Sequence, residues 1–284
     1  MFDRFQRSSD LAAECWRLLM EDKSLLVFPL LSSVAMVLIV GSFALPLLPA
    51  FGIAAGRAAP HAALSPLGFL GLFLFYWVQY SIVLFFNTAL VEVAMRRFDG
   101  ENAGVGDGLR RAAALLPVIL AYALVAATVG TLLRAVAERV GILGRIVVGL
   151  VGVGWTVATA LVVPVLAAEN VGPVEAIGRS AELIKKAWGE DIIGNAGIGL
   201  VFGAAIVLLA ISGGVLVIAA FGNRAWVLGI VLATALVLLV CLLGLAQATL
   251  QGIYAAALYR FATGDPATGG IDRGLLENAF GARR

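Results

Sequence analysis

Charged side chains are scarce in this chain of 284 residues. Asp, Glu, Lys and Arg make up 13% of it, whereas hydrophobic residues make up 61% and the mean hydropathy is +1.00. A soluble globular domain carries about 25% charged residues. The sequence therefore predicts an all-α integral membrane protein, and the net charge of +2 gives no reason to expect a nucleic-acid partner.

Histidine and cysteine are also nearly absent, with His61, Cys15 and Cys241 as the full set. These residues cannot supply a His pair, an HExxH helix, a Cys/His metal cluster, a CxxC motif or a disulfide framework. Serine does not occur in a GxSxG motif, and the glycine run GVGDG at 104–108 follows no predicted strand, as a phosphate-binding loop would require. We therefore expect no catalytic residue, no metal site and no cofactor, and we do not expect an enzyme.

Long apolar stretches are abundant instead. Six of them can each cross a hydrocarbon core of about 30 Å, because a helix rises about 1.5 Å per residue. They lie near residues 25–51, 66–94, 113–136, 143–168, 192–221 and 226–254. The charges within residues 1–24 and the length of the first stretch argue against a cleaved signal peptide.

Lysine and arginine are divided unequally by these spans. Fifteen of the 20 lie on the side of the two termini and five on the other side, so the positive-inside rule places both termini in the cytoplasm. Arginine far outnumbers lysine, and Ala, Gly, Val and Leu dominate, a composition typical of bacteria with GC-rich genomes. We therefore expect a multi-pass protein of the cytoplasmic (inner) membrane of a prokaryote.

One charged segment is written twice, as RSSDLAAECW at 7–16 and RSAELIKKAW at 179–188. In each copy, five residues recur at helical steps of three and four, so they would form one stripe along a helix. These stripe residues are Phe2, Phe5, Ser9, Ala12 and Trp16 in the first copy, and Val174, Ile177, Ala181, Ile184 and Trp188 in the second. Such helices lie in the membrane interface with Trp at headgroup depth, so we expect interfacial amphipathic helices at 1–24 and 169–191.

Each copy leads into a hairpin with a similar exit, AMRRFDGENAG at 94–104 and ALYRFATGDPATGG at 257–270. This pattern predicts a parallel internal repeat within a single membrane domain. Besides the two amphipathic helices, the domain contains the first hairpin and exit loop at 25–112, the middle hairpin at 113–168, and the last hairpin and tail at 192–284. The stretch DGLRRAAALLPVIL at 107–120 reads as a degenerate third copy without Trp.

The run VVPVLAAENVGPVEAIGRSAELIKKAW at 162–188 resembles the signature of the glycerophosphodiester phosphodiesterase membrane-domain superfamily. The opening FQRSSDLAAECWRLLMEDKSLLVFPLLS at 5–32 is similar to the start of an uncharacterised six-span prokaryotic family related to it, a domain of unknown function. The resemblance implies a helical membrane module of unassigned activity, in which any chemistry belongs to a fused soluble domain.

Polar side chains in the spans are the remaining candidates for a site. Glu92 ends the second span with Arg96 one turn further on, which favours a salt-bridged helix end over a proton or ion site. Glu169 and Asn170 end the fourth span, where Glu169 can face either Arg179 or a neighbouring helix end. They are the strongest candidates for a functional site, although a structural hinge is favoured. The uncharged amides deeper in the spans, which most often bond between helices, are Gln79, Asn87, Gln247 and Gln251.

Proline adds one mechanical expectation. Pro164 lacks an N–H donor close to the end of the fourth span, so it should bend the chain into the second interfacial helix. Asn170 or Gly172 can then end the span before that helix begins.

Two functions remain open. The first is a non-enzymatic membrane module, a scaffold, partner subunit or lipid-interacting component that contacts the cytoplasmic leaflet. Its contact residues would be Trp16, Arg179, Lys185, Lys186 and Trp188, with the two lysines directing any preference for anionic lipid to the second copy. The alternative is a transporter or channel for a lipidic or small amphipathic substrate, lined by the four amides. Membrane lipids are the expected partners, and a protein partner or homo-oligomer is left open.

Overall fold

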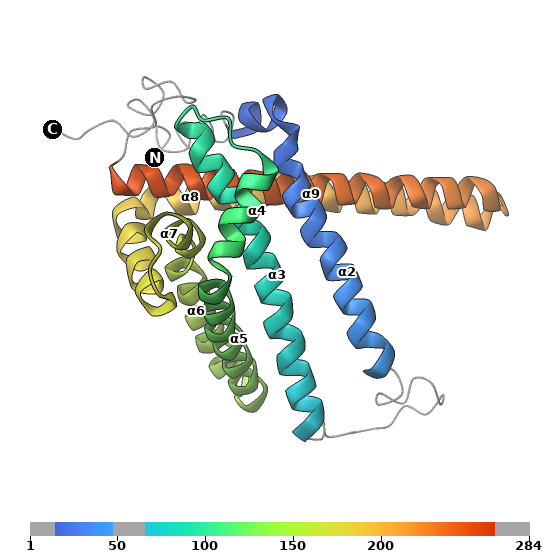
Figure 1. The fold of residues 1–284 in the computed structure, drawn as a ribbon. Coiled ribbons are helices and arrows are strands. Elements are labelled where there is room, and N and C mark those ends of the chain that lie inside the picture. The colour runs from blue at the N-terminus through green and yellow to red at the C-terminus, as the bar shows by residue number, and fades with distance from the viewer. Residues whose placement is uncertain (1–14, 48–65, 265–284) are drawn as a thin grey trace. The chain divides into compact units, whose positions relative to one another are not determined.

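The structure, a computed structural model, describes residues 15–47 and 66–264, with side chains except at 44–47, 66–69, 72 and 186–196. The described residues contain helices and no strand, which confirms the predicted all-α class for this part of the chain. Residues 15–21 form a first helical segment. The elements that follow (Figure 1) are η1 (Lys23–Leu26), α2 (Val27–Leu47), α3 (Pro66–Phe98), α4 (Val105–Ala114), α5 (Leu116–Arg139), α6 (Ile142–Ala158), α7 (Val162–Glu169), α8 (Pro173–Gly222) and α9 (Trp226–Thr263).

Six segments in the described ranges are long and apolar enough to cross a membrane, which confirms the six predicted spans. These segments are Lys23–Phe43, Phe73–Phe98, Leu116–Arg139, Ile142–Glu169, Gly197–Gly222 and Trp226–Thr263. The depth of these segments in the bilayer and the side of the membrane on which the termini lie stay predictions from the charge distribution.

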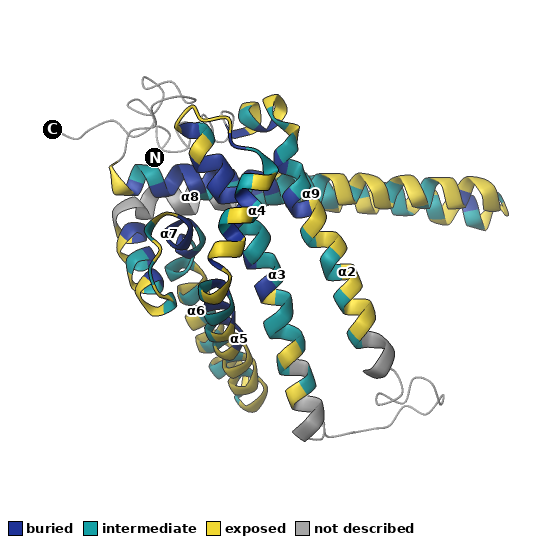
Figure 2. Ribbon diagram, in the orientation of Figure 1, coloured by how far each residue is buried: buried dark blue, intermediate teal, exposed yellow. Residues whose placement is uncertain are grey.

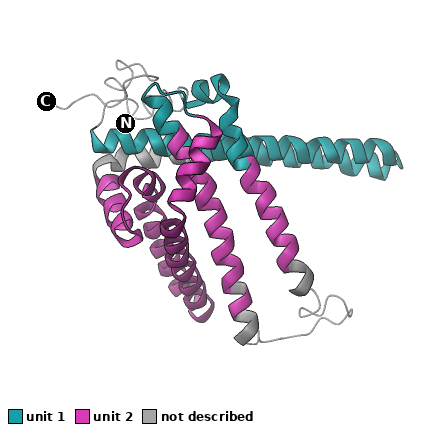
Figure 3. Ribbon diagram, viewed as in Figure 1, with its two compact units in different colours: residues 1–29, 94–103, 186–284 teal, residues 30–93, 104–185 magenta. Residues whose placement is uncertain are grey.

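The chain divides into two compact units (Figure 3), and each has its own core. In the unit built from residues 1–29, 94–103 and 186–284, Phe28, Phe98 and Tyr254 are almost fully buried. In the unit built from residues 30–93 and 104–185, the equivalent core side chains are Leu90, Ile119, Leu161, Leu166 and Leu183.

Burial is uneven along the spanning helices (Figure 2). In α3 it is concentrated in the C-terminal half, in α5 in the N-terminal half, and in α9 mainly in residues 249–262. These are the halves that the Lys and Arg distribution assigns to the cytoplasmic side. Side chains in the other halves are largely exposed, for example Leu132 of α5 at 59% and Val227 of α9 at 78%, as expected of residues that face lipid hydrocarbon.

α8 is one uninterrupted helix of 50 residues, or about 75 Å. The segment predicted as an interfacial helix at 169–191 therefore continues without a break into the fifth span, and its amphipathic role stays a prediction. No proline follows Pro173 within α8, and a glycine such as Gly189 costs only about 1 kcal/mol in a helix interior. Residues 1–14 of the first predicted amphipathic helix lie outside the described residues, so the two-copy repeat stays a prediction.

The fourth span consists of two helices, because α6 ends at Ala158 and α7 begins at Val162. The predicted bend is present, but it lies before Pro164 and not after it. Pro164 has no N–H to bond the carbonyl of Ala160 four residues earlier, and the Val162 amide donates to the Thr159 carbonyl at 3.1 Å in a tighter turn. As expected, Asn170 ends α7, with a left-handed φ of 52°.

The connection between α5 and α6 is only two residues long, and a glycine makes it possible. A Cβ on Gly144 would lie 2.5 Å from the Cβ of Val140 at the end of α5. Real Cβ atoms do not approach so closely, so the turn at residues 140–141 depends on the absence of a side chain at position 144.

We predict that Gly144→Ala lowers the free energy of unfolding by about 1–3 kcal/mol, because the hairpin must open to admit the new methyl group. The control is Gly149→Ala on the same helix, where nothing lies within 4 Å of the new Cβ and alanine favours the helix. Thermal unfolding in detergent should show a lower midpoint for the first variant only. Equal midpoints would contradict a tight turn at residues 140–141.

Candidate functional site

α7 is a short helix with a buried face and two ends that need hydrogen-bond partners. Its eight residues include buried Val162, Pro164 and Leu166. The amide of Leu161, freed by the break before α7, donates to the hydroxyl of Ser180 at an N···Oγ distance of 3.0 Å. Ser180 is fully buried near the start of α8, so this side chain replaces a helical hydrogen bond that the broken span has lost.

Two arginines bind the other end of α7. Arg111 of α4 donates from Nη2 to the carbonyl of Ala167 at 2.8 Å. Arg179 of α8 donates from Nε to Oε1 of Glu169 at 3.2 Å, which confirms that Glu169 faces Arg179. Cationic groups are favourable at a helix C-terminus, where the last carbonyls carry partial negative charge.

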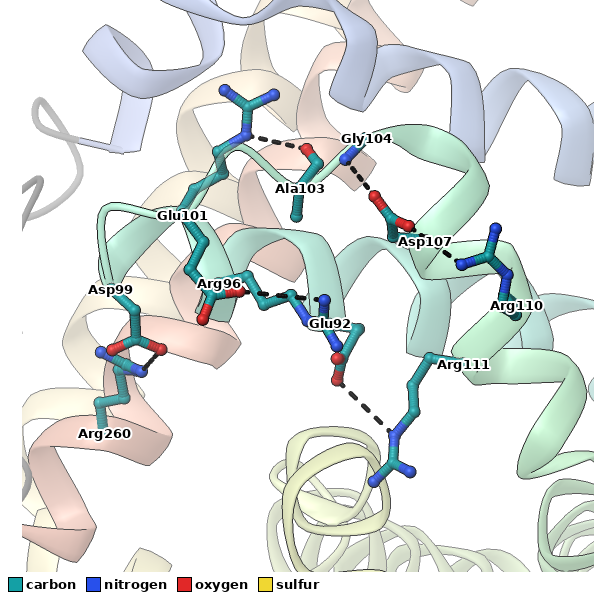
Figure 4. Close-up of polar contacts among 11 residues, drawn as sticks. Glu92, Arg96, Asp99, Glu101, Ala103, Gly104, Asp107, Arg110, Arg111 and Arg260 are labelled. Atoms are coloured by element: carbon teal, nitrogen blue, oxygen red, sulfur yellow. Dashed lines mark hydrogen bonds and ion pairs between the residues drawn. The ribbon is translucent and has the colours of Figure 1, made fainter.

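Arg111 also reaches the end of the second span (Figure 4). Its Nε lies 3.9 Å from Oε2 of Glu92, a residue of α3 that is only 7% exposed. The sequence suggested Arg96 as the ion-pair partner of Glu92, and Arg96 pairs with Glu101 at 3.9 Å. The sequence spacing predicted an ion-paired helix end correctly, but Arg111, 19 positions away, was not foreseen as a partner.

We call Glu92, Arg111, Glu169, Arg179 and Ser180 the α7 clamp. Arg179 contacts a second carboxylate, Glu182, at 3.5 Å, and its hydrogen bond with Glu169 is the main cause that raises the pKa of Arg179 above its ordinary value. Two positive charges therefore meet three negative ones. Glu92 and Glu169 are each paired with an arginine from another helix, so the geometry favours the structural interpretation of these residues over an ion site.

α4 and the start of α8 present the same pattern to the core. Each has three buried positions spaced by four and then three residues, with an arginine directly before the middle one. The positions are Gly108, Ala112 and Leu115 beside Arg111, and Ala176, Ser180 and Leu183 beside Arg179. The signal was visible in the sequence as DGLRRA and EAIGRS, which supports the degenerate third copy as a continuing prediction.

The other unit has its own ion pairs, formed by the arginines of the two predicted repeat exits. Arg97 places Nη2 2.7 Å from Oδ2 of Asp22 and donates from Nε to the Ala103 carbonyl at 3.0 Å. Arg260 of the second exit pairs with Asp99, an acid within the first exit (Figure 4). Both exits are therefore tied down by carboxylates within this unit.

The predicted lipid-contact residues fall into three groups. Trp16 is 43% exposed on the helical segment 15–21, and Lys185 is exposed on α8. Arg179 belongs to the α7 clamp. Lys186 and Trp188 lie on α8, but their side chains are outside the described part of the structure.

Gln79 and Asn87 are both half-buried on α3. The Oε1 atom of Gln79 is buried and has no hydrogen-bond partner. A polar atom in this position is costly in a hydrocarbon environment, and this is the one amide of the four for which the structure shows an unmet acceptor.

Gln247 and Gln251 are half-buried one turn apart on α9, where Gln251 lies near Gly199 of α8. Gln247 follows Trp226 by 21 residues. That distance is about 32 Å of helix, roughly the whole hydrocarbon thickness. If Trp226 marks one interface, these two amides lie at the opposite interface and not at midplane.

Comparison with known proteins identifies a family and no individual relative. A family model described as "Family of unknown function (DUF6159)" matches residues 66–270, which is more than half of the chain. No curated protein and no solved structure matches the chain.

We predict that Ser180→Ala lowers the free energy of unfolding by about 1–3 kcal/mol, because the buried Leu161 amide loses its acceptor. Ser212→Ala on the same helix is the control, since that hydroxyl is exposed and donates only to the Leu208 and Leu209 carbonyls of its own helix. Thermal unfolding in detergent should separate the two variants. The role of Ser180 as a replacement acceptor would be disproved by a Ser180→Ala variant as stable as Ser212→Ala.

Proposed function

The chain belongs to the DUF6159 family of unknown function, and we propose that it is a non-enzymatic membrane module that interacts with lipids or acts as a scaffold. The proposed location is the cytoplasmic membrane of a prokaryote, with both termini in the cytoplasm. The observation that carries the lipid interaction is the exposed apolar stripe of the helical segment 15–21.

This segment has two apolar sides. Cys15 and Leu19, one turn apart, are 1% and 3% exposed and belong to the core of their unit. Trp16 and Met20, also one turn apart, are 43% and 54% exposed. An apolar stripe that the protein does not cover, next to one that it does cover, is typical of a helix that also rests on a membrane.

The position of Trp16 supports this assignment. Its ring centroid lies 6.3 Å from that of Phe202, a residue close to the start of the apolar segment Gly197–Gly222. Trp is enriched where headgroups meet acyl chains, because its ring is apolar and its N–H is polar. Arg17 and Glu21 pair at 3.6 Å on the exposed side of the same segment.

The start of α8 offers a second contact. Val174 is 75% exposed, whereas Ile184 of the same predicted stripe is 2% exposed and lies in the core with Leu183, so only the beginning of this stripe is open to lipid. Arg179 is engaged by two carboxylates, and we therefore assign the preference for anionic lipid to the exposed Lys185 and its neighbour Lys186.

The relation to the glycerophosphodiester phosphodiesterase membrane-domain superfamily stays a proposal from the motif at 162–188. Within that motif, Pro164 lies just after the helix break, and Ser180 accepts a hydrogen bond from the Leu161 amide that the break frees. Glu169 and Arg179 form an ion pair. The transporter alternative gains little support, because Gln247 and Gln251 lie at a predicted interface. Support for a transporter would require a polar cavity at the midplane of the bilayer.

We predict that Trp16 sits at the boundary between headgroups and acyl chains. The emission of Trp16 is obtained by subtracting the fluorescence of a Trp16→Phe variant from that of the wild type, both as full chains in lipid bilayers. Lipids brominated near the headgroup should quench this emission more strongly than lipids brominated near the chain end. Strong quenching by aqueous acrylamide, with no effect of either lipid, would refute the contact.

We predict that Lys185→Gln combined with Lys186→Gln weakens the preference for phosphatidylglycerol over phosphatidylcholine about fivefold per charge. Native mass spectrometry of the detergent-solubilised full chain measures the bound lipids. The control is Lys23→Gln, which removes the only other lysine. An equal loss per charge in the control would show general electrostatic attraction and not a patch at the start of α8.

A further inference from the structure

Three arginines gather at the tip of the α5–α6 hairpin, on the side of the membrane that the charge distribution assigns to the exterior. Arg134 and Arg139 lie in the last two turns of α5, and Arg145 lies in the first turn of α6. One acid, Glu138, accompanies them. The tip therefore carries a net charge of about +2 at the edge of a hydrocarbon environment, where an unmatched charge is costly.

The short connection brings these side chains together. Gly144 allows α6 to start directly against the end of α5, and Arg145 folds back to donate from Nε to the Ala137 carbonyl at 3.2 Å. Arg134 donates from Nε to Oε1 of Glu138 at 3.1 Å. Glu138 is thereby occupied by Arg134, and the excess charge falls on the two remaining arginines.

Arg134 is held in place by a further contact, which its Nη1 makes to the hydroxyl of Tyr76 on α3 at 3.2 Å. Arg139 and Arg145 are exposed and form no ion pair with any carboxylate of the described residues. The other segments predicted on the exterior side, residues 48–65 and 222–225, contain no Asp or Glu. Arg139 and Arg145 are therefore available to an anion from outside the chain.

The surface below the tip indicates what kind of anion this is. Ile142 and Leu143 are 80% and 81% exposed, and Ile146, Val147 and Leu150 continue an apolar face down α6 with exposures of 57–67%. A soluble anion would use only the arginines. A phospholipid uses both features, since its phosphate meets the guanidinium groups while its acyl chains lie along α6.

We propose that the α5–α6 tip is a binding site for an anionic phospholipid of the exterior leaflet, with Arg139 and Arg145 binding the headgroup phosphate. This site is independent of the cytoplasmic contacts of Trp16 and Lys185, because it uses different residues. Arg134 is a positioning residue, which fixes the end of α5 through Glu138 and Tyr76. The site would anchor the middle hairpin to its leaflet.

The test compares Arg139→Gln combined with Arg145→Gln against Arg224→Gln, which removes an exposed arginine from the other short exterior turn. Native mass spectrometry of the full chain in detergent titrates phosphatidylglycerol and, separately, diacylglycerol with the same acyl chains. The double variant should bind phosphatidylglycerol at least about tenfold more weakly, whereas the control and all diacylglycerol titrations should stay unchanged.

A single variant and a phosphate competition complete the test. Arg139→Gln alone removes a charge without removing any intramolecular hydrogen bond that the structure shows, so it remains informative if the double variant does not fold. Inorganic phosphate should not displace the lipid. The proposal is overturned if the double variant and Arg139→Gln bind phosphatidylglycerol like the wild type, if Arg224→Gln loses as much affinity, or if free phosphate displaces the lipid. Any of these results would leave the proposed cytoplasmic contacts untouched, since those are tested by Trp16 and the lysines.

Discussion

One missing hydrogen-bond donor organises the unit that contains residues 104–185. Pro164 has no N–H, which accounts for the break in the fourth span, and the break leaves backbone groups that need other hydrogen-bond partners. Ser180 accepts from the Leu161 amide and Arg111 donates to the Ala167 carbonyl, which repairs both ends of α7. These two hydrogen bonds connect α7 to α4 and to the start of α8, so the break in the span contributes to the packing of these helices.

Ion pairing distinguishes basic side chains that hold helices together from those that could bind a lipid. Arg111 and Arg179 are held by Glu92, Glu169 and Glu182, and a paired guanidinium has little left for a lipid. Among the residues that the structure describes, positive charge without an ion pair is found at Lys185 and at the α5–α6 tip. Both places border exposed apolar surface, which is the combination that a phospholipid matches.

Sequence reasoning was most successful where a local rule applied. The six spans followed from length and hydropathy, Arg179 was one of the two partners foreseen for Glu169, and Asn170 was one of the two residues foreseen to end the fourth span. It was less successful where two rules competed. α8 passes through Gly189 because no proline follows, and the break precedes Pro164 because the ring removes a bond four residues earlier.

By itself, the sequence determined that this is a helical membrane protein, how many spans it has, and which side each charged segment is expected to face. These properties depend on whether a stretch of about 20 residues is apolar enough to enter a bilayer. That can be judged from the stretch alone, without knowing which other helices it packs against. Only the tertiary structure decided that Arg111 serves both Glu92 and α7, and that Ser180 accepts from Leu161. Those contacts join residues 19 to 56 positions apart, and hydropathy carries no information about which polar group meets which once helices pack.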